Sequence, residues 1–182
     1  FEITVTNESG AYDGNEKVIK VKSNLAGVTI VYGTTTSYGT TAVSSATANT
    51  DYAIAKATNA STTTIYYKAS KAGYQDVTGS ATLKIDKVEL TVTAENKSVT
   101  YGDNLPSYTY TITGFVNSET ESVLTTKPTA TCSYAKFSNV GTYDITVSGG
   151  VATNYTFKYV KASLTVNKRT VTATWPNVVS FG

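Results

Sequence analysis

One pattern of strand and turn recurs along this chain and limits the folds that are open to it. The pattern is a Thr-Val-Thr strand followed by a turn that carries an aromatic residue and glycine, and it occurs at residues 3–14, 90–103 and 170–182. The closing strand recurs too, because Leu83–Lys87 is matched by Leu164–Lys168 at an offset of about 80 residues, the size of one small domain. The sequence therefore predicts two complete modules, at residues 1–87 and 88–168, and the incomplete start of a third repeat at residues 169–182.

Apolar and polar residues alternate with a period of two through most of the chain. Ala81, Leu83 and Ile85 form one such series, and short clusters of Gly, Asn and Asp separate the series from one another. This alternation is typical of half-buried strands, and the chain is rich in Thr, Val and Tyr, which favour strands. We therefore expect an all-β chain of two tandem antiparallel β-sandwich modules with immunoglobulin-like architecture.

Residues 117–124 depart from the strand pattern. Ser118 and Glu121 have the spacing of a capping box, and Glu119 and Glu121 place two acids in a first turn, where the helix dipole favours them. We expect one short helix here in the second module, ending before Pro128. A β-grasp arrangement of that module is the alternative, because a sheet interrupted by one helix after a hairpin fits this segment equally well.

The joints between the expected modules are short. Only Asp86–Glu89 and Asn167–Arg169 stand between the expected strands, without a run of Gly, Ser or Pro that would loosen them. We expect the modules to follow one another in a stiff, extended arrangement.

Charge and histidine content exclude several classes of function. The formal net charge is +2 and is spread evenly, so we expect no nucleic-acid partner, and we expect no insertion of these residues into a membrane. The chain has no histidine, which removes Ser-His-Asp and Cys-His catalysis and His-ligated zinc. Cys132 is the single cysteine, and its neighbours predict a buried small side chain that forms no disulfide within this chain.

Oxygen-rich positions could in principle serve catalysis or calcium. Glu119 and Glu121 could be an acid pair, but residues two apart on a helix do not face each other, and helix capping already explains them. The calcium candidates lack the closely spaced acids of a strong loop motif, so turn formation explains them better. We therefore expect no catalytic, cofactor or metal site; the calcium candidates are Asp13 with Asn15 and Glu16, and Asp103 with Asn104.

Fourteen tyrosines make the aromatic residues the remaining candidates for binding. Most should lie in the core, including the row Tyr155, Phe157 and Tyr159, and Tyr143 is placed to pack inside while its hydroxyl bonds back to a loop. Adjacent strand residues point to opposite faces, so one member of the pair at 66–67 should be exposed. The candidates for sugar contacts are Tyr66, Tyr67, Tyr38 and Trp175.

An isopeptide crosslink and the Asn-X-Ser/Thr triplets are two further chemical possibilities, and we predict no functional residue from either. A Lys, an Asn and a carboxylate can form an isopeptide crosslink, but the sequence does not bring such a set together. Asn-X-Ser/Thr triplets are expected by chance in so Thr-rich a chain, and we assign no role to the four present, at Asn7, Asn59, Asn96 and Asn154.

Residues 88–168 resemble the MBG domain of the YGX type, found in tandem in large bacterial surface proteins. The resemblance rests on residues 90–94, 99–103, 108–115, 118–124, 140–147 and 154–166. Residues 1–87 look more loosely like a bacterial immunoglobulin-like repeat, through 11–14, 28–33 and 65–82. The resemblance implies a secreted or cell-envelope multidomain protein without enzymatic activity in these modules, and it carries no ligand-binding positions over to this chain.

These observations together favour a non-catalytic stalk or adhesion segment of a bacterial protein. We expect it outside the cell, on the cell surface or attached to the cell wall, with neighbouring repeats of the same chain and an unidentified protein or glycan as partners. The alternative is a glycan-binding module, one that could accompany a carbohydrate-active enzyme.

Overall fold

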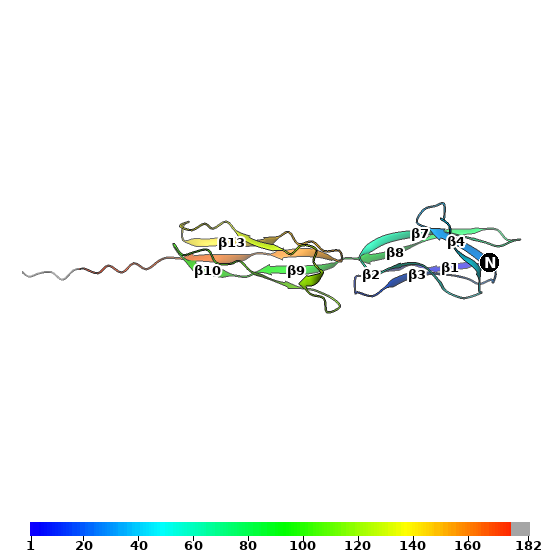
Figure 1. The fold of residues 1–182 in the computed structure, drawn as a ribbon, viewed down its shortest axis with the longest axis horizontal. Coiled ribbons are helices and arrows are strands. Elements are labelled where there is room, and N and C mark those ends of the chain that lie inside the picture. The colour runs from blue at the N-terminus through cyan, green and yellow to red at the C-terminus, as the bar shows by residue number, and fades with distance from the viewer. Residues whose placement is uncertain (176–182) are drawn as a thin grey trace, which may run out of the picture. The chain divides into compact units, whose positions relative to one another are not determined.

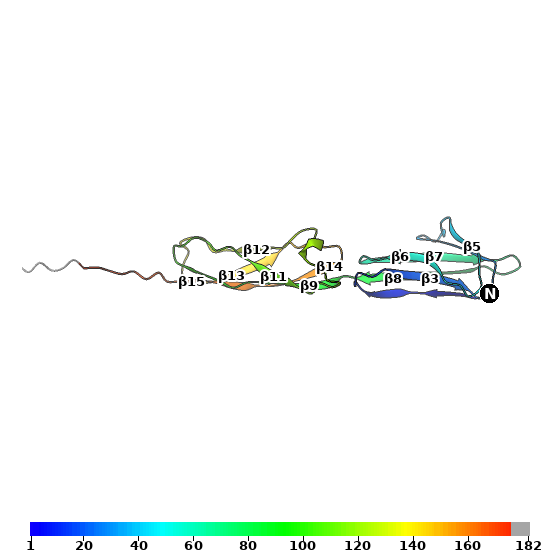
Figure 2. The same cartoon turned by 60° about the horizontal axis from the view of Figure 1, so that its bottom comes forward.

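The computed structural model describes residues 1–175, in which the regular secondary structure is β-strand apart from one short 3-10 turn (Figures 1 and 2). The chain divides into two compact units. Unit 1 consists of Phe1–Leu90, Gly114–Thr126 and Val151–Thr156, and unit 2 consists of Thr91–Thr113, Lys127–Gly150 and the chain from Phe157 on. Unit 1 thus takes in two segments of the predicted second module, whose boundary at residue 88 stays a prediction. Among the described residues no helix has the length and apolar character needed to cross a membrane.

Unit 1 contains two sheets, with the strand orders β1-β3-β6 and β2-β8-β7-β4-β5. Burial alternates along the strands: in β3, Ile19 and Val21 are fully buried while Lys20 between them is exposed. The buried side chains face the interior of the sandwich, as the period-two pattern predicts. The strands are β1 (Ile3–Thr6), β2 (Glu8–Ala11), β3 (Lys17–Ser23), β4 (Val28–Gly33), β5 (Thr41–Ala46), β6 (Tyr52–Ala57), β7 (Ser61–Ser70) and β8 (Val77–Asp86).

The remaining strands form two further sheets, with the orders β10-β15-β13-β12 and β11-β9-β14. The first residues of β9 and β14 belong to unit 1, and both strands continue into unit 2. These strands are β9 (Val88–Ala94), β10 (Lys97–Thr100), β11 (Tyr110–Thr113), β12 (Thr129–Cys132), β13 (Gly141–Ser148), β14 (Tyr155–Val160) and β15 (Ala162–Asn167).

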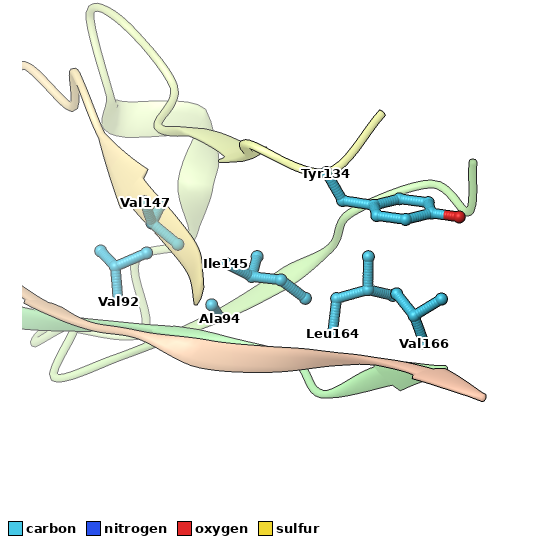
Figure 3. Packing of buried hydrophobic residues seen from close by; sticks show 7 residues of the cluster. All are labelled: Val92, Ala94, Tyr134, Ile145, Val147, Leu164 and Val166. Carbon is cyan, nitrogen blue, oxygen red and sulfur yellow. The ribbon is translucent and has the colours of Figure 1, made fainter. Parts of the chain in front are cut away.

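The core of unit 2 is a cluster of seven buried side chains (Figure 3). Leu164 and Ile145 are fully buried, and the ring of Tyr134 belongs to the same cluster. Cys132 was expected to be buried and is instead half-buried, packed against this cluster. The cluster consists of Val92, Ala94, Tyr134, Ile145, Val147, Leu164 and Val166.

The opening strand of each repeat changes sheets, and this produces one parallel strand pair in each. β1 pairs antiparallel with β3, and after Asn7 the chain enters β2, which pairs parallel with β8. β9 pairs antiparallel with β11, and after Asn96 the chain enters β10, which pairs parallel with β15. The sandwiches are therefore mixed at this position and not wholly antiparallel as expected.

The helix expected at residues 117–124 is only a single 3-10 turn, η1 (Glu121–Val123). Its N-cap is Thr120, whose hydroxyl accepts a hydrogen bond from the backbone N–H of Ser122, so the predicted capping box that begins at Ser118 is wrong. Asn117 and Ser118 both have positive φ, which takes the backbone out of the helical region before the turn starts. The β-grasp alternative needed a helix here, and the second repeat instead has two sheets like the first.

Candidate functional site

The four aromatic residues expected to contact sugar do not form one surface. Tyr66 and Tyr67 point to opposite faces of β7, so Tyr67 is buried and Tyr66 is half-buried. Tyr38 is half-buried, and its backbone passes close to Gly33, the register partner of Tyr66. Trp175 is 87% exposed and belongs to unit 2. A ligand site made by these side chains stays a prediction.

The row of aromatic residues on β14 is only partly in the core. Tyr155 is buried and Phe157 is half-buried, but Tyr159 is 37% exposed, so the expectation of a buried row is wrong for its last member. β14 is an edge strand, so the far end of its row is open to solvent. The rings of Phe157 and Tyr159 stack with an interplanar angle of 6° and centroids 6.0 Å apart.

The calcium candidates make bonds with neighbouring side chains and backbone. The carboxylate of Asp13 accepts hydrogen bonds from Lys17 Nζ at 2.8 Å and from the backbone N–H of Asn15 at 2.9 Å, and these bonds lower the pKa of Asp13 to about 2. Glu16 forms an ion pair with Lys56 at 3.1 Å. In the second repeat the side chain of Asp103 binds Arg169, and Asn104 accepts a bond from Lys136. These contacts agree with the interpretation that the residues shape turns.

Three carboxylates line a shallow polar depression on unit 1, those of Glu8, Glu16 and Asp51. Glu8 accepts a hydrogen bond from the backbone N–H of Val18, and Glu16 is paired with Lys56. Within residues 1–175 no group of three or more acidic, Cys or His side chains is close enough to hold a metal ion.

Tyr12, Glu119 and Tyr155 form a tyrosine–glutamate cluster inside unit 1. The hydroxyl of Tyr12 donates to Glu119 Oε1 at 2.5 Å, and the hydroxyl of Tyr155 donates to the other carboxylate oxygen. The two tyrosine rings meet edge to face with centroids 5.8 Å apart, and Phe115 packs on Tyr155 in the same way at 5.5 Å. Residues that are 107 positions apart are thereby fixed together.

The electrostatics of this cluster keep both phenols protonated. The hydrogen bond from Tyr12 to Glu119, followed by burial, raises the pKa of Tyr12. Burial, followed by the bond to Glu119, raises the pKa of Tyr155 to about 12. The half-buried carboxylate of Glu119 accepts a hydrogen bond from each phenol, so this cluster links three segments of the chain.

A second set of bonds beside the cluster centres on Asn154. Its Oδ1 accepts from the backbone N–H of Ala60 at 2.9 Å, and its Nδ2 donates to Asn59 Oδ1 at 3.0 Å. Its backbone carbonyl accepts from the N–H of Val88 at 3.0 Å. Nearby, Lys87 Nζ donates to the carbonyl of Ala152 at 3.0 Å. The segment 151–156 is thus bonded at several points to residues 59–60 and 87–88 within unit 1.

The tyrosine near the start of β13 behaves as the sequence predicts. Tyr143 packs against the core of unit 2, its ring meets that of Tyr134 at 5.2 Å, and its hydroxyl donates to the carbonyl of Asn139 at 2.8 Å. The contacts made by Glu119 and Asn154 had no comparable signal, because neither residue stands near its partners in the sequence. The roles of both side chains in unit 1 were therefore missed.

Comparison with known proteins finds a match to a family model and weak likenesses to solved structures. Residues 90–165 match the sequence model of the MBG domain (YGX type). No curated protein matches the chain. Among solved structures, the fibronectin(III)-like modules of Clostridium thermocellum CbhA are similar with 13% identity and a TM-score of 0.34, over 92% of this chain and 95% of that chain.

The matched residues begin within β9 and end within β15, and they include Glu119 and Tyr155 of the tyrosine–glutamate cluster. They also include the Tyr101-Gly102 turn and the strand that follows Tyr143. Residues 90–165 therefore match the MBG domain of the YGX type, as their motifs indicated.

Proposed function

We propose that this chain is a non-catalytic spacer or adhesion segment of a secreted or cell-surface bacterial protein. The proposal rests mainly on the match of residues 90–165 to the MBG domain. The polar side chains of this module form hydrogen bonds in turns, at strand ends and between distant segments of the chain. Such a segment needs folded modules with hydrated outer faces and does not need a reactive centre.

The outer faces of the strands support the proposal. Along β13 the exposed positions carry Thr142, Asp144, Thr146 and Ser148, while Ile145 and Val147 are buried. Thr keeps the strand propensity high and offers water a hydroxyl group, so these faces avoid large apolar patches. This surface chemistry suits a segment that must stay extended and unassociated in water.

Surface labelling of intact cells tests the location. Antibodies raised against the 182-residue chain should label the cells that produce the protein without permeabilisation, whereas antibodies against a cytoplasmic protein should not. Labelling that appears only after permeabilisation would contradict the proposal.

A glycan-binding module is the second candidate, and the stacked pair Phe157 and Tyr159 favours it. Sugars bind on flat aromatic faces, and Tyr159 is partly exposed, although its hydroxyl also accepts a bond from the N–H of Gly150 at 2.9 Å. A glycan array probed with the 182-residue chain should show no signal if the segment is only a spacer. A signal that is lost in Tyr159→Ala and kept in Tyr74→Ala, a change at another exposed tyrosine, would support the binding module instead.

A further inference from the structure

Unit 1 has an end surface that is covered by a later part of the chain. The covered surface, which we call the filled socket, receives ring, amide and carboxylate contacts from the segments 114–126 and 151–156. The segments supply what we call the plug. The filled socket consists of Tyr12, Asn59, Ala60 and Lys87, and the plug consists of Glu119, Ala152, Asn154 and Tyr155.

Unit 2 repeats the strand arrangement around Tyr12 at Tyr101. β2 pairs parallel with β8 and is followed by Tyr12, whose N–H donates to Asp86 O at 2.9 Å. β10 pairs parallel with β15 and is followed by Tyr101, whose N–H donates to Asn167 O, also at 2.9 Å. Tyr101 is therefore the structural counterpart of Tyr12.

The other socket positions have counterparts by the same register. Lys87 follows the last residue of β8, and Lys168 follows the last residue of β15. Ser61 pairs with Ile85 and Gly141 pairs with Val166, so the two residues before each are equivalent. Residues 59 and 60 thus correspond to Asn139 and Val140, and an asparagine is present at the first position in both repeats.

The counterpart surface in unit 2 is open. Tyr101 is 36% exposed, whereas Tyr12 is 6% exposed under its plug. Val140 is 41% exposed. Phe137 is 64% exposed, and its ring meets that of Tyr101 edge to face, with the ring centroids 6.1 Å apart. A shallow pocket lies here, and its lining contains all four counterparts, namely Tyr101, Asn139, Val140 and Lys168, together with Arg169 and Val171.

Phe137 is held outward by a backbone conformation that is unfavourable for it. Its φ is +72°, in the left-handed region that costs a non-glycine residue roughly 1–2 kcal/mol. Lys136 lies over the Phe137 ring, with Nζ 5.5 Å from its centroid.

We propose that Tyr101, Asn139, Val140 and Lys168 form an open socket for a further module of the same chain that continues from residue 169. The incoming module would place an aromatic ring and a carboxylate on Tyr101 and an asparagine side chain on residues 139–140, as the plug does in unit 1. The inference depends on the repeated arrangement of strands and not on the proposed spacer function.

Charge and sequence both fit this occupant. Lys168 and Arg169 line the open socket, Arg169 being paired with Asp103, and Lys136 lies over the Phe137 ring that contacts Tyr101, so a carboxylate equivalent to Glu119 would be attracted to it. The sequence that follows begins with Thr-Val-Thr at residues 170–172, as at residues 91–93 in β9.

The test is a lengthened chain in which residues 1–168 are followed directly by a second copy of residues 88–182. The new junction joins Lys168 to Val88, as Lys87 is joined to Val88 in the natural sequence. The appended copy is labelled with ¹⁵N, so that its peptides differ in mass from those of the first copy. Hydroxyl-radical footprinting then reads the solvent exposure of each Tyr and Phe in both copies.

The reactivity of Tyr101 in the first copy should fall about six-fold relative to the 182-residue chain, because 36% and 6% are the exposed fractions of Tyr101 and Tyr12. The reactivity of the exposed Tyr74 and of Phe1, whose ring contacts it, should not change. Changing Glu119 and Tyr155 to Ala in the appended copy alone should restore the reactivity of Tyr101. An unchanged Tyr101 in the lengthened chain would overturn the proposal.

Folding of the appended copy is read from its own Tyr134, which is buried in the core of unit 2. A control chain carries a flexible Gly–Ser linker between Lys168 and the copy, so that the copy can fold away from the open socket. A copy that folds behind the linker but not when joined directly would also contradict the proposal, because the open socket should accept it as the filled socket accepts its plug.

Discussion

The carboxylate of Glu119 shows how single residues hold distant segments of this chain together. It accepts bonds from two phenols, one near the start of the chain and one in β14, and both rings are buried around it. Removing it leaves two buried hydroxyl groups without their acceptor, and an unsatisfied buried polar group is costly.

Glu119→Ala should therefore destabilise unit 1 by about 1–3 kcal/mol, measured by urea denaturation. The matched control is Glu16→Ala, which removes an ion pair whose side chains are 57% and 50% exposed and should cost at most about 1 kcal/mol. Equal small losses in both variants would show that the tyrosine–glutamate cluster does not fasten unit 1.

Alkaline pH should weaken the same cluster. The pKa of Tyr155 is raised to about 12, above the value of about 10 that an unfolded tyrosine has, so the unfolded chain loses its proton first as pH rises. The contribution of Tyr155 is complete below about pH 10 and is lost between about pH 10 and about pH 12. Tyr12, whose pKa is also raised, acts in the same direction.

Thermal melts of the natural chain and of Tyr155→Phe, recorded between about pH 9 and about pH 12, isolate this effect. The natural chain should lose roughly 1–3 kcal/mol more stability over that range than the variant, because the other titrating groups are common to both. Parallel losses in the two proteins would contradict the assignment.

At the scale of elements, two asparagines mark the places where the opening strand of a repeat changes sheets. Asn7 Oδ1 accepts from the N–H of Thr82 in β8 at 3.0 Å, and Asn96 Oδ1 accepts from the N–H of Ser163 in β15 at 2.8 Å. The side chain thus replaces a backbone partner at the break between the two strands.

Asn7→Ala should speed hydrogen exchange at the Thr82 amide, and Asn96→Ala should do the same at the Ser163 amide, with a loss of about 0.5–1.5 kcal/mol in each repeat. Each variant is the control for the other, because the amide in the unmutated repeat should keep its rate. If both amides exchange as in the natural chain, the two breaks are held by something other than these side chains.

Gly114 is an element boundary that admits no side chain. Its φ is +103°, and a Cβ there would lie 2.8 Å from the carbonyl oxygen of Glu89. Gly149 also has a positive φ, +86°, but its Cβ would meet nothing within 4 Å. Gly149→Ala should cost about 1–2 kcal/mol and Gly114→Ala at least about twice as much, both measured by chemical denaturation. Equal costs would show that Glu89 can move away.

Much of the fold could be predicted from the sequence because strands and turns leave local signals. The period-two pattern gives the buried faces, and the Tyr-Gly turns mark Tyr12 and Tyr101, which occupy equivalent places. The Tyr143 hydroxyl bond to a loop was also predictable, since its partner is only four residues away.

The tyrosine–glutamate cluster of unit 1 could not be predicted, because its residues are far apart in the sequence. Glu119 stands in an apparent capping sequence, yet its carboxylate is used by tyrosines 107 and 36 residues away. Asparagines in Asn-X-Ser/Thr triplets have no assigned role by sequence, whereas in the structure all four bond to backbone or to each other; they are Asn7, Asn59, Asn96 and Asn154.

At the scale of the whole molecule, the proposed spacer function requires that the modules follow one another in line and do not merge into one globule. A compact globule of 182 residues has a radius of gyration of about 16 Å. The short joint supports the requirement, because Lys87 alone separates β8 from β9.

Small-angle X-ray scattering of the 182-residue chain tests whether the modules follow one another in line. An in-line arrangement should give a radius of gyration clearly above about 16 Å. Its distance distribution should have a long tail, as for a particle much longer than it is wide. A radius close to that of the compact globule, with a symmetric distance distribution, would contradict it.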